Sequence, residues 1–415
     1  MNKSFSIRNY FLLMMVMAVL CFITILPSAI TAWQVNRWSL GFTNEFLAKD
    51  FGNTPYDLVP PQAHRRATLW LSREALEMGL PERALALLNP ILKNQTRDVL
   101  WVQGEAFFEM GDIEGAIGAW EKARDYQSLI KAGNLAETKG LFDTAELAYL
   151  SGWKVNPVAG ILPLVNFMWQ IQGDPVSAEQ ILRVSLSSYD PKNLDWLRSL
   201  GLILQTQLRW DDAISVYQEA LDQRPDDLYS LNLIGHAYLI GKNDYARAQN
   251  IFEHMISLAP SNGGGYFGMG ELSAMEGEIE KADEWYVKAL DRSPEKCWWW
   301  LTRANNQRNA GNISKALDLY LETIEHFPGS ENAYYELSWG YKLNNQSIEA
   351  IKSIERAIKI NSIEDKFYWR AGMIYEWAGM SKEALASYEN SYLLSPTNEE
   401  FEIAIERLKS LDELP

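Results

Sequence analysis

Cysteine and histidine are scarce in this sequence. Only two cysteines and four histidines occur among 415 residues. Two cysteines are too few for a disulfide framework or a cysteine-rich zinc site. No two of the histidines stand four residues apart, as they do in a metal-binding helix; they are His64, His236, His254 and His326. We therefore expect no metal ion.

Positive charge is also in short supply. Lysine and arginine total 38, against 54 aspartate and glutamate residues, which gives a net charge of −16. Nonspecific attraction to a phosphate backbone needs the opposite balance. We therefore expect no nucleic-acid partner.

Catalytic motifs are missing as well. The sequence has no Gly-x-Ser-x-Gly elbow and no Gly-Lys-Ser/Thr phosphate loop. Residues 263–268 carry the glycines of a dinucleotide fingerprint, but they follow Pro260 in an expected turn, with no strand before them. The sequence predicts a non-catalytic protein without a cofactor, and an enzyme is the weakest alternative.

One long apolar run stands at the amino terminus. Residues 10–26 contain no charged side chain, and continuation to Trp33 approaches the roughly twenty residues that a spanning helix needs. We predict that residues 1–33 form an uncleaved membrane anchor. The alternative is a cleavable signal peptide, because Pro27 breaks the helix and residues 30–32 form a tolerable cleavage site.

Charges beside this run predict its orientation. Lys3 and Arg8 precede it, and Arg37 is the only near counterweight. This asymmetry favours a single-pass protein with a cytoplasmic amino terminus and its bulk on the extracytoplasmic side of the membrane. Residues 34–64 are rich in glycine and proline and are predicted to be an irregular linker.

A regular helical period follows the linker. Apolar and small residues in the stretch 197–225 recur at spacings of three and four, which indicates two amphipathic helices. The alanine that opens the second helix recurs at steps of 35, 34, 34, 34 and 34 residues, at Ala213, Ala248, Ala282, Ala316, Ala350 and Ala384. Looser steps extend the frame backwards to ten alanines, through Ala178, Ala145, Ala116 and Ala84.

A 34-residue helix-turn-helix period is typical of the tetratricopeptide repeat, and the sequence resembles that family. The resemblance is carried by first-helix glycines, second-helix aromatics and closing prolines: Gly201, Gly235, Gly270 and Gly372; Tyr217, Phe252, Tyr286, Tyr320 and Tyr388; Pro225, Pro260, Pro294, Pro328 and Pro396. It implies an all-α, right-handed superhelical solenoid of about ten repeats over residues 65–396. Residues 397–415 are expected to form a capping helix and tail, which would complete a chain that begins with a transmembrane helix.

The resemblance also implies where a ligand binds. In the family, first helices line a concave groove that holds an extended peptide or a partner helix. We expect first-helix residues outside the packing frame to face this groove: Arg198, Tyr229, Asn232, His236, Phe267, Trp298, Asn305, Arg308, Tyr335, Trp339, Lys342 and Trp369. Aromatic side chains dominate the set, as they do at binding hot spots.

Three consecutive tryptophans form the sharpest local feature. Neighbouring residues of a helix point about 100° apart, so three rings in a row cannot all face one core. We expect Trp298 to face the groove, Trp299 the adjoining helix and Trp300 the packing interior.

Two functions fit this sequence. The first is a membrane-anchored scaffold that binds a partner protein or peptide in the groove. The second is a glycan-binding or accessory component of cell-envelope polysaccharide assembly or export, since aromatic rings also stack on sugars.

Overall fold

The computed structural model describes residues 61–412, except residues 94 and 397. The predicted anchor, its orientation and nearly all of the predicted linker lie outside the described residues. Over the residues that are described, no helix combines the length and the apolar character needed to cross a membrane.

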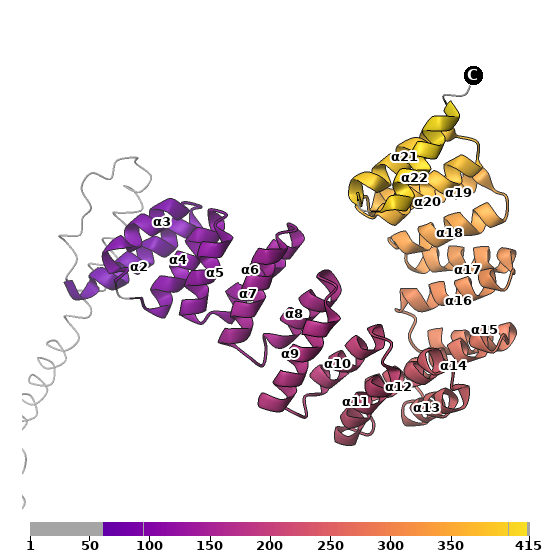
Figure 1. The fold of residues 1–415 in the computed structure, drawn as a ribbon, viewed down its shortest axis with the longest axis horizontal. Helices are drawn as coiled ribbons and strands as arrows, with labels where there is room; N and C mark the ends of the chain where they lie inside the picture. The colour runs from indigo at the N-terminus through magenta and orange to yellow at the C-terminus, as the bar shows by residue number, and fades with distance from the viewer. Residues whose placement is uncertain (1–60, 94, 397, 413–415) are drawn as a thin grey trace, which may run out of the picture. The chain divides into compact units, whose positions relative to one another are not determined.

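Helices make up all the regular secondary structure of the described residues, and they follow one another in pairs (Figure 1). The chain forms two compact units, one up to Pro191 and one from Lys192 onwards. The first unit contains four pairs: α2 (Pro61–Glu77) with α3 (Pro81–Leu88), α4 (Arg97–Glu109) with α5 (Ile113–Ala123), α6 (Tyr126–Thr138) with α7 (Phe142–Val155), and α8 (Ile161–Asn166) with α9 (Pro175–Ser188). A short 3-10 helix, η2 (Asn89–Ile91), follows α3.

The second unit contains six pairs and a final helix. The pairs are α10 (Leu194–Thr206) with α11 (Trp210–Gln223), α12 (Leu228–His236) with α13 (Tyr245–Leu258), α14 (Gly264–Met275) with α15 (Ile279–Leu290), α16 (Cys297–Asn309) with α17 (Ile313–His326), α18 (Glu331–Leu343) with α19 (Ser347–Ile360), and α20 (Asp365–Trp377) with α21 (Ser381–Leu394). The last helix is α22 (Glu399–Asp412). The described part of the chain is thus an all-helical solenoid of repeated pairs, as predicted, while its handedness stays a prediction.

The ten alanines of the predicted frame explain why the pairs pack closely. Each lies on the second helix of a pair, from Ala84 in α3 to Ala384 in α21, and each is 0% exposed. A methyl side chain at this position lets neighbouring helices approach each other closely, and no larger side chain would fit without moving them. The frame predicted from the sequence is therefore confirmed through all ten pairs.

A glycine on the first helix often faces an aromatic ring on the second. A Cβ atom added to Gly201 would lie 2.1 Å from Cε1 of Tyr217, and one added to Gly372 would lie 2.4 Å from Cε1 of Tyr388. Both distances are far below van der Waals contact. The ring therefore packs directly on the backbone of its partner helix.

The turn within each pair contains one residue in the left-handed backbone conformation. This is the position at which helices commonly end with glycine. Seven of the ten turns of the described chain use glycine there, and the others use Leu208, Asn243 and Asn345. Leucine raises the conformational free energy at this position, because its Cβ is strained at positive φ.

Two first helices end in a π-helical turn. The turn η4 (Ala237–Gly241) follows α12, and the backbone N–H of Lys242 donates to the carbonyl oxygen of Ala237, five residues back. The turn η3 (Phe167–Ile171) follows α8 in the same way. A π-turn holds one residue more than an α-helical turn. At η4 this accounts for the step of 35 residues between Ala213 and Ala248.

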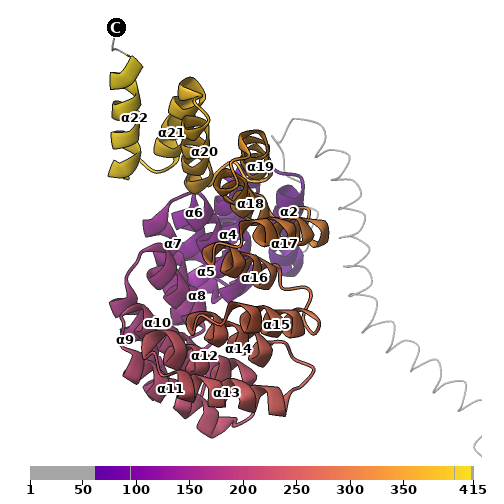
Figure 2. The same cartoon turned by 90° about the vertical axis from the view of Figure 1, so that its right-hand side faces the viewer.

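The two ends of the described array agree with the sequence prediction to different degrees. At the first end, α2 includes residues 61–64, which were predicted to belong to the linker, and proline is compatible with the first turn of a helix as well as with a linker. At the other end α22 lies beside α21 (Figure 2), and Ala404 and Leu408 pack against Ala384 and Tyr388. This is the capping helix that the sequence predicted.

Candidate functional site

All twelve residues predicted for the groove lie in the second unit, on the first helices α10, α12, α14, α16, α18 and α20. Tyr229 and Trp298 are the most exposed, at 51% and 54%. Most of the others are half-buried and contact a neighbouring first helix. We call this row of helices the first-helix surface and describe it from α10 towards α20.

Phe267 does not belong to the exposed part of this surface. It is 2% exposed, because the ring of Trp299 from α16 stacks on it with centroids 4.7 Å apart and an interplanar angle of 13°. The ring of Tyr286 from α15 packs against it as well, at 5.4 Å. Its predicted place in the groove is therefore wrong, since the next repeat covers it.

The three tryptophans face three directions, as their helical spacing predicts. Trp298 is exposed, and its ring meets that of Phe267 in an edge-to-face arrangement with centroids 4.7 Å apart. Trp299 is buried on Phe267 of the adjoining helix. Trp300 is buried in the core, and its Nε1 donates to the carbonyl oxygen of Pro294 at 3.0 Å.

Charged pairs join consecutive first helices. Arg198 of α10 contacts Asp227 at 2.6 Å, beside the start of α12, and its guanidinium lies 5.3 Å from the ring centroid of Tyr229. His236 of α12 contacts Glu271 of α14 at 2.6 Å, and Nδ1 of the same ring lies 2.7 Å from the carbonyl oxygen of Asn232. These contacts hold the side chains of the predicted residues Arg198 and His236, while Asn232 takes part only through its backbone carbonyl oxygen.

A group of cations and aromatic rings lies on α18 and α20, and we call Tyr335, Trp339, Lys342 and Arg370 the cation–aromatic cluster. The guanidinium carbon of Arg370 lies 3.9 Å from the ring centroid of Tyr335 and 4.6 Å from that of Trp339. The Lys342 ammonium nitrogen lies 3.9 Å from the Trp339 centroid. Two cations therefore share one indole ring.

No carboxylate of the described residues forms an ion pair with Lys342 or Arg370, although the charges of Glu376 and Glu336 act on them from further away. Glu336 pairs with Arg308, and Glu376 takes a bidentate ion pair from Arg407 at 2.6 and 2.8 Å. Neither carboxylate lies within ion-pair distance of Lys342 or Arg370. Burial lowers the pKa of Lys342 and the nearby charge of Arg370 lowers it further, while the charge of Glu376 opposes this shift.

Arg370 is the functional candidate that sequence reasoning missed. Its Nη2 donates to the Tyr335 hydroxyl at 2.7 Å, whereas Nε and Nη1 are buried without a hydrogen-bond partner. Its repeat-equivalent position 34 residues earlier holds Glu336, so the periodicity alone did not mark it as cationic or aromatic. Trp369, which was predicted instead, packs between Tyr388 and Phe401 beside the capping helix.

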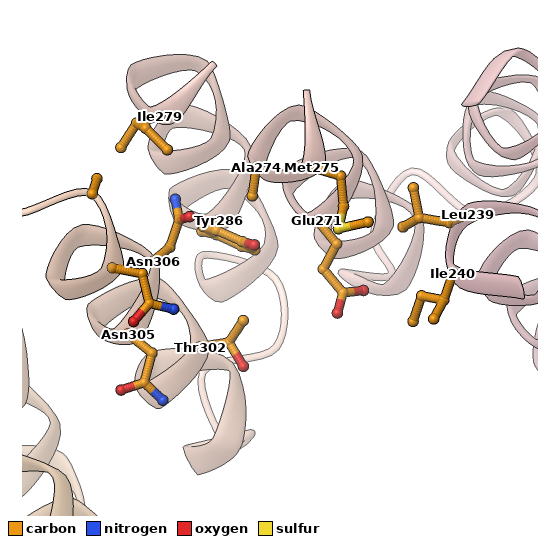
Figure 3. Close-up of a pocket in the computed structure, with 12 residues that line it drawn as sticks. Leu239, Ile240, Glu271, Ala274, Met275, Ile279, Tyr286, Thr302, Asn305 and Asn306 are labelled. Atoms are coloured by element: carbon orange, nitrogen blue, oxygen red, sulfur yellow. The ribbon is translucent and has the colours of Figure 1, made fainter. Parts of the chain in front are cut away.

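A cavity of about 480 Å³ opens between η4, α14, α15 and α16. Figure 3 shows Leu239 and Ile240 on one side and Asn305, Asn306 and Thr302 on the opposite side. Glu271 and Met275 of α14 lie between them. We call this cavity the amide pocket. Of the predicted site residues, only Asn305 lines it.

Among the described residues, no three histidine, cysteine, aspartate or glutamate side chains come together in a way that could hold a metal ion. The glycine run 263–268 opens α14, and a Cβ on Gly268 would lie 2.4 Å from the ring of Phe252. Gly268 therefore serves helix packing.

Two family models described as tetratricopeptide repeat match this chain. One matches residues 71–128 and 172–228, and the other matches residues 228–262 and 331–363. The matches fall in both compact units and on the repeated helix pairs.

Two curated proteins are similar in sequence. Protein O-mannosyl-transferase TMTC3 of Homo sapiens is 21% identical over 238 residues, which cover 54% of this chain and 26% of that protein. A TPR repeat-containing protein of Methanocaldococcus jannaschii is 25% identical over 231 residues, which cover 50% of this chain and 40% of that protein. The chain thus spans less than half the length of either relative.

Similar solved structures include two tetratricopeptide repeat proteins. One is from Parabacteroides merdae, with 16% identity, a TM-score of 0.39 and coverage of 68% of this chain and 98% of the other. The second is YrrB, a TPR protein with an unusual peptide-binding site, with 15% identity, a TM-score of 0.35 and coverage of 46% and 97%.

Proposed function

We propose that this chain, which belongs to the tetratricopeptide repeat family, is a scaffold whose first-helix surface binds an acidic segment of a partner protein. The observation that carries this proposal is the cation–aromatic cluster. The whole chain has a net charge of −16, yet Lys342 and Arg370 lie together without a carboxylate partner among the described residues.

Placing two cations at one aromatic ring costs free energy. Two like charges near one ring repel each other, and an aromatic face offsets only about 0.5 to 2 kcal/mol per cation. An incoming carboxylate would relieve the repulsion. A hydrogen bond to a charged group contributes roughly 1.5 to 3 kcal/mol, which is enough to make Lys342 a binding hot spot.

The two cations take different parts in this proposal. Nε and Nη1 of Arg370 are covered by protein, so a ligand does not reach them directly. Lys342 is half-buried and ends near solvent at the end of α18. We assign the direct contact to Lys342 and a fixed supporting charge to Arg370.

A binding experiment with the full chain in detergent tests the proposal. Peptides that contain a Glu-Glu pair are compared with the same peptides carrying Gln-Gln, and binding is measured by fluorescence anisotropy. We expect the acidic peptides to bind more tightly and Lys342→Ala to remove the difference. Lys288→Ala is the matched control, because Lys288 lies 4.0 Å from the Trp285 ring centroid on a second helix. Equal binding of Glu and Gln peptides would contradict the proposal.

A glycan ligand is the second candidate, and the exposed ring of Trp298 favours it. A half-exposed indole can stack on a sugar face. Under this alternative, glycan copurifies with the membrane-extracted protein, Trp298→Ala removes it and Lys342→Ala does not. Peptide binding that needs Lys342 but tolerates Trp298→Ala supports the acidic partner instead.

We also propose that residues 1–33 tether the scaffold to a membrane, with the repeats on the extracytoplasmic side. The support is the uncharged run 10–26 and the positive charges at Lys3 and Arg8. A membrane-impermeant protease added to intact cells should degrade the repeats. Protection of the repeats would contradict this orientation, and a mature chain beginning at Trp33 would replace the anchor by a signal peptide.

A further inference from the structure

The amide pocket has one apolar side that no part of the described chain covers. Ile240 of η4 is 56% exposed and Met275 of α14 is 48% exposed, and both line the cavity. Ala274 and Ile279 add further apolar surface to the cavity, with Ile279 on the side of Asn306 (Figure 3). Burying these side chains against an aliphatic group would remove apolar surface from water, which is favourable.

The π-turn supplies part of this apolar side. The extra residue of η4 lengthens the helix by one position before its turn. Leu239 and Ile240 both belong to η4. Leu239 is 1% exposed and anchors the turn in the core, while Ile240 stays accessible at the cavity. π-turns are often found at functional sites. This one is built into the pocket wall.

The opposite side offers an amide donor. The Tyr320 hydroxyl donates to Oδ1 of Asn305 at 2.5 Å, which leaves the amide nitrogen of Asn305 to donate elsewhere. Nδ2 of Asn306 is buried without a hydrogen-bond partner, so a ligand does not reach it directly and the accessible donor is Asn305. The Thr302 hydroxyl donates to the carbonyl oxygen of Trp298, so it can only accept further bonds. A carbonyl oxygen of a polypeptide backbone matches this donor.

The charge of the pocket points to a neutral occupant. Glu271 is the only ionisable carboxylate among the residues that line it, and its side chain is bound by His236. An acidic group would be repelled by Glu271, and a basic group would have to compete with His236 for it. A volume of about 480 Å³ is larger than a single side chain and holds a short piece of extended chain.

We infer that the amide pocket binds an aliphatic residue of the same partner segment, with the flanking backbone hydrogen-bonded to the side-chain amide of Asn305. The inference rests on the proposed function, because it assumes that the segment also places an acidic residue at Lys342. The partner is thus a segment with one aliphatic and one acidic anchor.

The repeat geometry sets the spacing between these anchors. The pocket lies at α14 and α16, and the cation–aromatic cluster lies two repeats later, at α18 and α20. Packed helices lie about 10 Å apart, so the two sites are separated by roughly 20 Å. An extended chain covers about 3.3 Å per residue, which corresponds to about six residues.

The test uses the full chain in detergent and synthetic peptides in which one leucine and one Glu-Glu pair are separated by two to ten glycine and serine residues, in both orders. We expect anisotropy titrations to give the tightest binding near six spacer residues. Replacing the leucine by serine should weaken binding about tenfold, and Ile240→Ser should cause a similar loss. Ile348→Ser is the matched control, because Ile348 is also an exposed isoleucine, 62% accessible, but lies on the second helix α19.

The outcomes separate the two proposals. If acidic peptides bind through Lys342 but leucine and spacing make no difference, the inference about the pocket is overturned and the acidic site stands. If no acidic peptide binds, the proposed function fails first. As an independent readout, a photoreactive leucine analogue in the peptide should label η4, α14 or α16, and labelling confined to other helices would overturn the inference.

Discussion

At the scale of single residues, His236 is held by two groups that accept hydrogen bonds. One ring nitrogen faces the carbonyl oxygen of Asn232 and the other faces the carboxylate of Glu271. Both contacts are satisfied only when both nitrogens carry protons. Burial lowers the pKa of His236, but the hydrogen bond and charge of Glu271 and the Asn232 carbonyl outweigh burial, so the pKa is raised above 6.5.

This raised pKa predicts a pH-dependent stability. Because the folded state holds the proton more tightly than the unfolded state, the contribution of His236 is fully present below pH 6.5 and is lost as the pH rises through the folded-state pKa. Urea unfolding of the wild type and His236→Gln should differ most at acidic pH and converge at alkaline pH. A difference that grows with increasing pH would show that the imidazolium is not the stabilising form.

Leu208 is a second residue whose backbone conformation affects the stability of the protein. It occupies the left-handed turn position with φ of +59° and is 73% exposed, so its side chain adds strain without much packing. Leu208→Gly should stabilise the protein by about 1 kcal/mol. The reciprocal change Gly277→Ala, at φ of +79° with open space around it, should destabilise it by a similar amount. Thermal denaturation monitored by circular dichroism would measure both, and a loss of stability in Leu208→Gly would contradict the strain argument.

At the scale of the helix pair, the glycine-to-ring contact decides how closely two helices pack. Gly201→Ala places a methyl group against Tyr217 and should cost about 1 to 3 kcal/mol of unfolding free energy. Gly118→Ala is the control, since its added Cβ meets nothing within 4 Å in an exposed position of α5, and it should be neutral or stabilising by about 0.5 to 1 kcal/mol. Urea titrations measure both, and equal effects would mean that helix propensity rather than the ring contact dominates.

The elements could be predicted well because each repeat restates the same local pattern. The buried alanines and the glycine-to-ring contacts are visible as a period in the sequence. The burial of Phe267 could not be predicted from its own repeat, since it depends on Trp299 of the next repeat packing on its ring. Arg370 was missed for a related reason: its environment is made by Tyr335 and Trp339 of another helix, 35 and 31 residues away.

At the scale of the molecule, stability accumulates from repeats and the interfaces between neighbours, so a free end is its weak point. Truncation after Pro396 removes α22, which buries Phe401 and Leu408 against the last pair. We expect a loss of roughly 3 to 6 kcal/mol in the terminal repeats, from about 1.5 to 3 kcal/mol for each large side chain. Size-exclusion chromatography should also show self-association through the uncovered face.

A Phe401→Ala and Leu408→Ala double variant keeps α22 but removes the side chains that pack it against the last pair. It should reproduce the lower melting temperature of the truncated protein. An unchanged melting temperature in both variants would show that the last pair is stable without its cap.

The π-turn at η4 also bears on how such a chain can change. A solenoid is built from repeats of equal length, and a residue inserted into one repeat would ordinarily shift the position of every later repeat. Here the extra residue is taken up within Ala237–Gly241, and the alanine steps return to 34 directly afterwards. The length of one repeat can therefore vary without disturbing its neighbours. If the amide pocket binds a ligand as we propose, a one-residue change of length at η4 would alter its wall and leave the later repeats in place.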